Sequence, residues 1–113
     1  MANDYKIRSR YWIEGNKGTY LGEGRVRLLL AIQEYGSISA AAKGLEISYR
    51  KAWKMVDIMN SQAKSPLVVR QIGGKSGGGT LVTPKGIEAI AAYKQLKEKC
   101  NAFVEKAFKE FEF

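Results

Sequence analysis

The sequence contains no histidine and a single cysteine among its 113 residues. Without histidine, the commonest general base, the usual serine and cysteine triads and the customary zinc ligands are all missing. One cysteine cannot form a disulfide within the chain, which excludes a secreted disulfide scaffold and favours a reducing compartment. We therefore expect a cytoplasmic protein with no catalytic residues, no metal site and no cofactor.

Long hydrophobic runs are also missing. The longest uninterrupted apolar runs, residues 28–32 and 89–93, have five residues each, whereas a membrane-spanning helix needs about 20. The first residues show no apolar segment after a basic one, so we expect neither a signal peptide nor a membrane partner. A composition of 45% apolar and 27% charged residues is that of a globular chain, and the length suits one domain.

Positive charge is concentrated in the first three-quarters of the chain. The net charge is +8. Residues 1–85 contain 14 basic and 6 acidic residues, while residues 86–113 contain five of each. A basic body favours an anionic partner, such as nucleic acid, a membrane surface or an acidic protein. The neutral tail is expected to serve packing or self-association.

The N-terminal region has the pattern of a β-hairpin. Residues 5–13 alternate between apolar or aromatic and basic side chains, which predicts a strand with one buried face. Turn-forming residues at 15–18 then return the chain into a short strand at 19–21. We expect Trp12 and Trp53 to anchor the hairpin and the core rather than to stack on nucleic-acid bases.

Two helices are predicted next. An apolar stripe over residues 23–35 predicts a helix that Gly36 ends. A short, alanine-rich helix follows, with Ser37 or Ser39 as its N-cap. Gly44 lies near the end of this helix, where we expect it to make a tight turn.

A third helix and a second hairpin follow. Ser48 is the expected N-cap of a helix that runs to about residue 62, with one apolar and one basic face. Strands are predicted over residues 67–72 and 80–82, joined by a glycine-rich tip at 73–79.

A long helix closes the sequence. Thr83 is its expected N-cap and Pro84 its first residue, and the helix is predicted to continue to Phe113, about 45 Å at 1.5 Å per residue. Apolar side chains recur at alternating three- and four-residue steps, as in a coiled coil. The seam expected to contact a second copy of the chain consists of Tyr93, Leu96, Cys100, Phe103 and Ala107.

This order of elements predicts an α+β fold, mostly α: a winged helix-turn-helix with an N-terminal β-hairpin and a long C-terminal dimerisation helix. Residues 1–83 would form the DNA-binding body and residues 84–113 the dimerisation helix, within one domain overall. In winged helix-turn-helix folds the third helix enters the DNA major groove. The residues expected to bind DNA are Ser48, Tyr49, Arg50, Lys51, Lys54, Arg70, Lys75 and Ser76.

The glycine-rich tip has two further interpretations. Its Gly-Lys-Ser sequence resembles the end of a phosphate-binding loop, but that motif requires a glycine where Val69 stands, and a helix must follow. Nucleotide binding is therefore disfavoured. The tip could lie against a DNA backbone with Lys75, or it could be an ordinary hairpin loop.

Several segments resemble a known family. Residues 36–43 (GSISAAAK) are similar to the first part of the LysR-type helix-turn-helix. Residues 47–53 (ISYRKAW) and 73–79 (GGKSGGG) together resemble the N-terminal domain of the ModE family of molybdate-responsive regulators. Residues 81–86 (LVTPKG) match the segment that enters the last helix. The resemblance covers residues 5–100, approximately.

The resemblance implies a dimeric transcription regulator that binds double-stranded DNA. It implies that Arg50, Lys51 and Lys54 meet the operator, that the hairpin around Lys75 is the wing and that the last helix is the dimer contact. Full-length ModE regulators continue into small β-barrel domains that bind molybdate. The sequence ends at Phe113, so we expect no molybdate-binding domain within this chain, and molybdate sensing is not carried over.

Two other functions compete with DNA binding. A protein-interaction adaptor could keep the winged-helix fold and bind an acidic partner through the same basic surface. A small hydrolase or transferase would need clustered acids, whereas the acids of residues 1–85 are scattered singly along the sequence.

Overall fold

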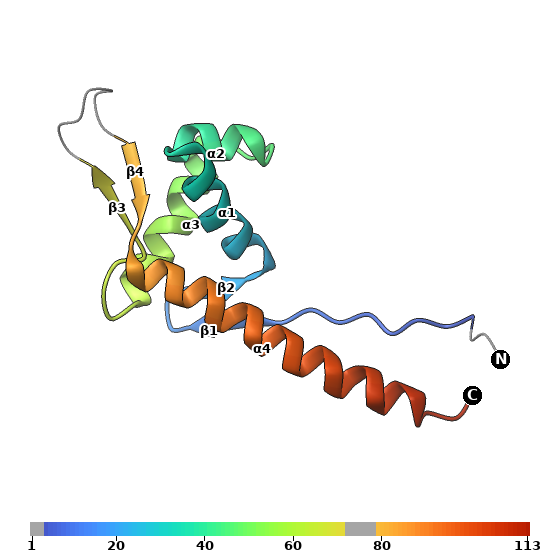
Figure 1. Ribbon diagram of the computed structural model, residues 1–113. Helices are drawn as coiled ribbons and strands as arrows, with labels where there is room; N and C mark the ends of the chain where they lie inside the picture. The colour runs from blue at the N-terminus through green and yellow to red at the C-terminus, as the bar shows by residue number, and fades with distance from the viewer. Residues whose placement is uncertain (1–3, 72–78) are drawn as a thin grey trace.

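A computed structural model describes residues 4–71 and 79–113. The described elements are β1 (Trp12–Gly15), β2 (Gly18–Gly22), α1 (Glu23–Tyr35), α2 (Ile38–Gly44), α3 (Tyr49–Gln62), β3 (Val68–Gln71), β4 (Gly79–Val82) and α4 (Pro84–Lys109). Each pair of strands forms an antiparallel hairpin. This arrangement confirms the α+β, mostly helical winged helix-turn-helix fold with a long C-terminal helix (Figure 1).

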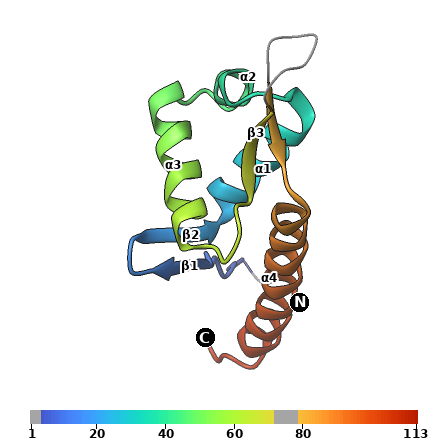
Figure 2. The ribbon, with the colours of Figure 1, turned by 90° about the vertical axis from the view of Figure 1, so that its left-hand side faces the viewer.

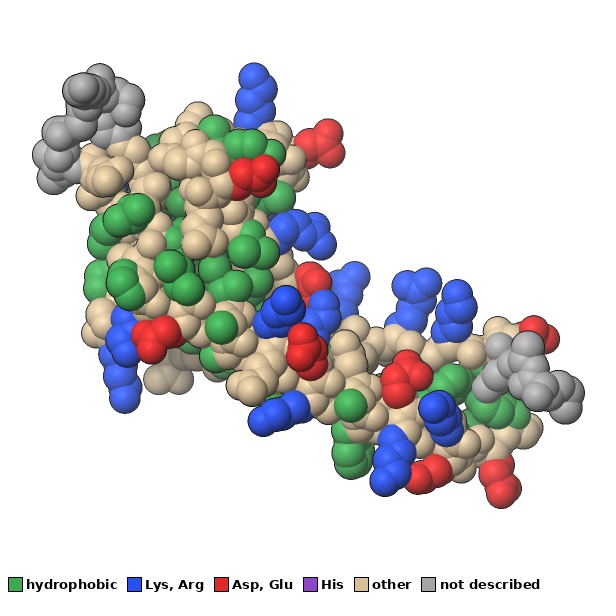
Figure 3. Space-filling view, in the orientation of Figure 1, with side chains coloured by type: hydrophobic (Ala, Val, Ile, Leu, Met, Phe, Trp, Pro, Cys, Tyr) green, Lys and Arg blue, Asp and Glu red, His purple; other side chains and the backbone are tan. Residues whose placement is uncertain are grey.

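The molecule consists of a body and an arm. Helices α1 to α3 and the two hairpins form the body, and most of α4 projects from it (Figures 1 and 2). The principal extents are 60 × 28 × 21 Å. The N-terminal segment from residue 4 runs beside α4, so the first described residues and the C-terminus lie near the far end of the arm. The arm carries both acidic and basic side chains (Figure 3), in agreement with its neutral charge balance.

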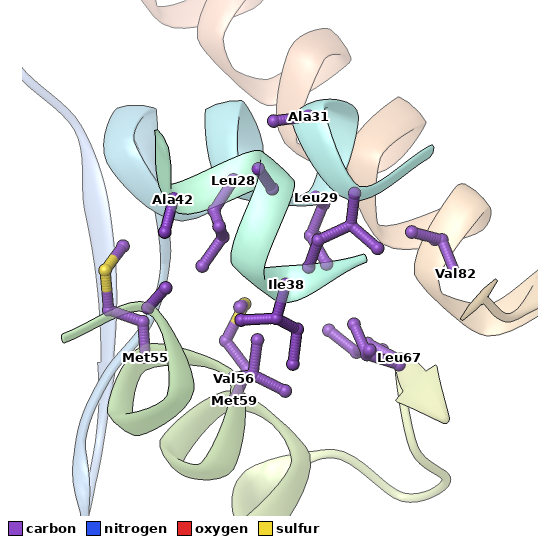
Figure 4. Packing of buried hydrophobic residues seen from close by; sticks show 14 of the residues in the cluster. Leu28, Leu29, Ala31, Ile38, Ala42, Met55, Val56, Met59, Leu67 and Val82 are labelled. Carbon is purple, nitrogen blue, oxygen red and sulfur yellow. The ribbon is translucent and has the colours of Figure 1, made fainter. Parts of the chain in front are cut away.

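The core lies between the three helices of the body (Figure 4). Leu29, Ile32 and Met59 are almost fully buried, and burying such side chains stabilises a fold by about 1.5–3 kcal/mol each. Ala41 and Ala52 are completely buried. Their small side chains allow α2 and α3 to approach their neighbours closely, as the alanine-rich sequence indicated.

Side-chain caps begin three of the helices. Ser37, Ser48 and Thr83 each accept a hydrogen bond from the backbone N–H three residues further on, at 3.0, 3.0 and 3.1 Å. The sequence predicted all three caps, and the structure selects Ser37 over Ser39 for α2. Because capping stabilises a helix end by about 1 kcal/mol, these residues fix where α2, α3 and α4 start.

The turn between α2 and α3 is a Schellman motif. The N–H of Ile47 donates to the carbonyl of Ala42 at 3.0 Å, and the N–H of Glu46 donates to the carbonyl of Lys43 at 3.2 Å. Glu46 takes the left-handed conformation that this motif requires, with φ 58°. The turn therefore contains a glutamate at the position that glycine usually occupies.

Gly44 does not make the tight turn that the sequence predicted. It is the last residue of α2, and the left-handed conformation falls on Glu46 two residues later. A Cβ atom at Gly44 would lie 3.0 Å from the ring of Tyr35. Glycine at this position is thus explained by the close approach of an aromatic ring from α1, which the local sequence pattern could not show.

The strand predicted over residues 5–13 is wrong for most of its length. The first strand begins only at Trp12, and the segment before it has no strand partner. The predicted buried face is also wrong, because Tyr5, Ile7 and Ile13 are 61%, 42% and 39% exposed. β2, in contrast, spans Gly18–Gly22 and confirms the short returning strand.

The N-terminal segment contacts α4 near one end and the residues that follow α4 near the other. The Tyr5 ring stacks on the Phe113 ring with centroids 4.5 Å apart. Near the other end, the Tyr93 hydroxyl donates to the carbonyl of Tyr11 at 2.8 Å. A period of two residues places these tyrosines on the same side of an extended chain. The segment thus contacts α4 and the residues that follow it, where the sequence pattern predicted a sheet.

The last helix ends at Lys109, four residues before the predicted end at Phe113. The chain then turns, and the Phe113 ring meets the rings of Phe108 and Phe111 edge to face, at 5.7 and 5.1 Å between centroids. These aromatic contacts among the last residues replace a final turn of helix.

Candidate nucleic-acid interface

Helix α3 presents one face to the core and the opposite face to solvent. Ala52, Val56 and Met59 are buried in the core. At about 100° per residue, Arg50 and Lys54 lie on the opposite side, and both are exposed. This arrangement confirms the amphipathic pattern predicted for the helix.

The start of α3 is accessible. Ser48 and Tyr49 are exposed, and 49% of the Tyr49 surface is free. The Ser48 hydroxyl oxygen accepts the hydrogen bond from Lys51 N–H that caps the helix, so its own proton remains able to reach an anion. The positive end of the helix dipole adds to the basic side chains here.

The wing is fastened to one flank of α3 by Asn60. The Asn60 Oδ1 atom accepts hydrogen bonds from the N–H groups of Leu67 and Val68 at 2.9 and 3.2 Å. Its Nδ2 atom donates to the carbonyl of Val68 at 2.9 Å. One side chain thus fixes the start of β3 against the third helix. Asn60 was not predicted from the sequence, since nothing in its local pattern indicates a contact with the following strand.

Arg70 extends from the wing toward the same flank. Its guanidinium carbon lies 5.1 Å from the centre of the Trp53 ring, a cation–π contact. Arg70 is therefore held close to the third helix while remaining exposed. Trp53 is partly buried, as expected for an anchor of the core, and it also positions a basic side chain.

The second wing strand is fastened to the turn between α1 and α2. The Thr80 N–H donates to the carbonyl of Gly36 at 2.8 Å. A Cβ atom at Gly79 would also lie 2.8 Å from that carbonyl oxygen. Glycine is required at position 79 because a side chain would push the wing away from the helices. Lys75 and Ser76, predicted to lie at the wing tip, are outside the described residues.

The opposite flank of α3 borders a hollow of about 470 Å³. Arg25 and Arg27 from α1 line it together with Lys51 and Lys54 from α3. Arg25 and Arg27 were not selected from the sequence, since their distance along the chain from α3 conceals the shared hollow.

The residues predicted for the dimer seam fall into two groups. Leu96 and Phe103 are 40% and 74% exposed, Ala107 is exposed and Cys100 is partly buried. Tyr93 is different: it is only 4% exposed and belongs to the core of its own subunit. Little of its surface is therefore left for a partner, and burial raises the pKa of its hydroxyl.

An ion pair also joins α4 to the body. The Lys97 ammonium donates to both carboxylate oxygens of Glu23 at 2.8 and 2.7 Å. This hydrogen bonding lowers the pKa of Glu23 and raises the pKa of Lys97. Together with the Tyr93 hydrogen bond, the pair sets the direction in which the arm leaves the body.

Neither a metal site nor a membrane span is evident in the part of the chain that the structure describes. Across residues 4–71 and 79–113, no three histidine, cysteine or acidic side chains are grouped as metal ligands would be. None of the helices in those ranges is both long and apolar enough to cross a bilayer.

Residues 24–87 match the sequence pattern described as "Bacterial regulatory helix-turn-helix protein, lysR family". The chain belongs to this family. The matched range covers nearly all of α1, the helix-turn-helix, the wing and the first residues of α4. The resemblance predicted from the helix-turn-helix residues is thereby confirmed.

Curated relatives of this lysR-family chain include proteins named ModE and MopB. It is 45% identical over 92 residues to molybdenum transport protein ModE of Azotobacter vinelandii, which covers 81% of this chain and 34% of that protein. It is 49% identical over 76 residues to molybdenum-pterin-binding protein MopB of Rhodobacter capsulatus, and the match covers 67% of this chain and 28% of that protein. It is 42% identical over 74 residues to DNA-binding transcriptional dual regulator ModE of Escherichia coli K12, and the match covers 66% of this chain and 28% of that protein. The chain thus spans about a third of the length of these relatives.

A solved structure shares the fold of this lysR-family chain. The structure described as "Crystal structure of CbnR_DBD-DNA complex" aligns with a TM-score of 0.57 over 77% of this chain and 94% of that one. At 17% sequence identity, the likeness concerns the fold.

Proposed function

We propose that this chain is the DNA-binding part of a transcription regulator and that it recognises a specific duplex sequence through α3. The observation that carries the proposal is the exposed basic face of α3. Arg50 and Lys54 project from that face beside an accessible helix start, and the wing is fastened at its flank. The chain would act by binding, with no catalysis.

The dimensions of α3 suit the major groove. That groove is about 12 Å wide, and a helix with its side chains is about 10–12 Å in diameter. Arginine can donate two hydrogen bonds to guanine, and lysine, serine and tyrosine can reach base edges or phosphates. Arg50 and Lys54 are the candidates for base contacts, while Ser48, Tyr49 and Lys51 lie where the helix start would approach the backbone.

The relatives support a role in transcription. Curated relatives carry the names of transcriptional regulators, and the solved structure with the matching fold is a complex with DNA. The function proposed here takes from them the binding of DNA. Molybdate is left aside because the segments of the relatives that this chain matches cover only about a third of their length.

We further propose that the chain binds DNA as a homodimer through α4. Leu96, Phe103 and Ala107 of the seam are exposed and Cys100 is partly buried, and the seam extends along α4 beyond α1 to α3 and the two hairpins. Hydrophobic side chains are visible along the arm in Figure 3. Pairing residues 84–113 of two copies about a twofold axis would present two third helices to one face of DNA, with half-sites about 34–36 Å apart.

Selection of duplexes from a random oligonucleotide pool, followed by gel-shift titration, tests the proposal. Replacing Arg50 or Lys54 by alanine should weaken binding to the selected duplex by about 1–3 kcal/mol if the side chain contacts a base. Lys64→Ala, two residues beyond the end of α3, is the control and should bind as the unmodified chain does. Equal binding by all three variants would contradict the placement of α3.

The salt dependence separates DNA from an acidic protein partner. The logarithm of the DNA-binding constant should fall with the logarithm of salt concentration, with a slope of about −0.9 for each phosphate neutralised. A chain that shows no such binding to any duplex yet retains an acidic protein would be the interaction adaptor instead.

A further inference from the structure

The hollow beside α3 is lined by basic residues from two elements that are distant in the sequence. Arg25 and Arg27 belong to the first turns of α1, and Lys51 and Lys54 belong to α3. The remaining lining is mostly apolar: Leu45, Ile47, Met55 and Ile58, with Gly24 at the rim. No carboxylate is among the described residues that line the hollow. Four positive charges therefore surround one opening with no acid inside it.

The two arginines are available to an anion. In residues 4–71 and 79–113, the ion pairs join Lys85 to Glu88 and Lys97 to Glu23, so neither arginine forms one. The charge of Arg27 does contribute to the lowered pKa of Glu23. The Nε atom of Arg25 is buried and has no hydrogen-bond partner among the described residues. A buried donor without a partner is costly, and an anion in the hollow is one source of the missing acceptor.

The position of the hollow relative to α3 indicates which anion it would bind. At about 100° per residue, Trp53 and Asn60 lie on one flank of α3, and Lys51 and Ile58 lie on the other. The first flank holds the wing through Asn60, and the second opens into the hollow.

A helix that fills the major groove has a phosphate backbone on each side, since the groove is about as wide as the helix. The wing with Arg70 would face one of these two backbones. The hollow with Arg25 and Arg27 would face the other.

We propose that this hollow is a contact site for the DNA phosphate backbone, in which Arg25 and Arg27 hold the strand opposite the wing. The inference rests on the proposed function of α3. Two arginines at this flank would fix the depth and angle of α3 in the groove without reading the sequence, because phosphates are the same at every base pair. Recognition by Arg50 and Lys54 would then depend on a helix clamped from both sides.

The experiment uses a double variant that carries both Arg25→Gln and Arg27→Gln. Its binding is compared with that of the unmodified chain on the selected duplex and on an unrelated duplex. At about 0.1 M salt, loss of two phosphate contacts should weaken binding by roughly tenfold or more on both duplexes. It should also make the log–log salt slope shallower by about 1.8, at about 0.9 per phosphate. The preference for the selected duplex should remain.

The control removes the same charge elsewhere. Lys64→Gln with Lys85→Gln takes away two exposed positive charges outside the hollow, so net charge falls equally. This variant should keep the unmodified salt slope. If the control and the arginine variant lose affinity equally, the effect is one of net charge and the proposed contact site is wrong.

Two further variants allow for a folding defect, since part of Arg25 is buried. Arg27→Gln alone changes an exposed side chain and should make the slope shallower by about 0.9. Arg25→Lys retains the charge and should retain the slope. Thermal unfolding shows whether each variant is folded at the temperature of the binding assay.

The outcomes separate this inference from the proposed function. If the salt slope is unchanged in folded Arg27→Gln and in the double variant, the hollow is not a phosphate contact site. The role proposed for α3 is retained if Lys54→Ala still weakens binding. Absence of salt-dependent binding by the unmodified chain overturns the proposed function itself.

Discussion

Single residues set the geometry around α3, and the roles of some of them could be predicted from the sequence while those of others could not. Ser37, Ser48 and Thr83 could be predicted as caps because capping depends on the residue and its next three neighbours. Asn60 could not be predicted, since its partners in β3 become neighbours only after the chain has folded. Gly44 was given the wrong role for the same reason: its neighbour is the ring of Tyr35.

Glu46 carries backbone strain that glycine would relieve. A residue with a side chain loses roughly 1–2 kcal/mol in the left-handed conformation, and Glu46 has φ 58°. Glu46→Gly should therefore raise the free energy of unfolding by about 1 kcal/mol in thermal or urea unfolding. The same change at Glu34, inside α1, should lower it, because glycine weakens a helix. Destabilisation by both substitutions would show that the turn is not strained.

Asn60 should be important for the attachment of the wing. Asn60→Ala leaves the N–H groups of Leu67 and Val68 without the oxygen that accepts their hydrogen bonds, at about 1–3 kcal/mol for a buried unsatisfied group. Urea unfolding should show this loss, and hydrogen exchange should be faster at Leu67 and Val68. Ser61→Ala is the neighbouring control, since its exposed hydroxyl donates to the carbonyl of Ile58 within α3 rather than to the wing. Unchanged exchange at β3 would contradict the role of Asn60.

At the scale of elements, periodic patterns predicted the helices well and the first strand poorly. The apolar stripes of α1 and α3 are sufficient to place those helices because each stripe faces the core. The stripe of α4 also predicted a helix, although most of it lies outside the core. The alternation in residues 5–13 was misleading because an extended chain against a helix shows the same period as a strand in a sheet. The hollow of Arg25 and Arg27 lay beyond prediction, since it forms between α1 and α3.

The Tyr93 hydrogen bond holds the start of the arm against the N-terminal segment. Tyr93→Phe keeps the buried ring and removes the hydroxyl that donates to Tyr11, so the free energy of unfolding should fall by about 1 kcal/mol. Tyr35→Phe, at an exposed ring, should have little effect. Equal stability of the two variants by urea unfolding would mean that this hydrogen bond contributes nothing measurable.

The ion pair between Glu23 and Lys97 predicts a pH dependence. The Lys97 ammonium lowers the pKa of Glu23 below its usual 4.5 in the folded chain, so protonation favours the unfolded state. The contribution is present above about pH 4.5 and is lost as the pH falls through the lower, folded pKa. Glu23→Gln should therefore reduce the acid-induced loss of stability in unfolding curves measured from about pH 6 to about pH 3. Parallel curves for the variant and the unmodified chain would show that the pair is not formed in solution.

At the scale of the whole molecule, the body and the arm differ in charge and in exposed apolar surface. The body holds the basic surface, while the arm is neutral and exposes apolar side chains beyond the reach of the body. The uneven charge could be read from the sequence. The assignment of Tyr93 to the subunit's own core could not, because the seam pattern is the same for packing within one subunit and between two.

The distal arm should control the oligomeric state. A double variant with Leu96→Glu and Phe103→Glu places two charges on the exposed seam. Analytical ultracentrifugation should then show a monomer in place of a dimer. Binding to a duplex with two half-sites should be weakened. Asn101→Glu adds a charge on another side of α4 and should leave the dimer intact. A monomeric unmodified chain at micromolar concentration would contradict the proposed dimer.

Insertion of α3 into the major groove is tested most directly by dimethyl sulfate footprinting of guanine N7 atoms, which lie in that groove, on a selected duplex. We predict two protected patches one helical turn apart, about 10 base pairs or a multiple of that, and loss of protection with Arg50→Ala. Protection that Arg50→Ala leaves unchanged, or bound DNA without protected guanines at a guanine-containing site, would contradict insertion of α3 into the groove.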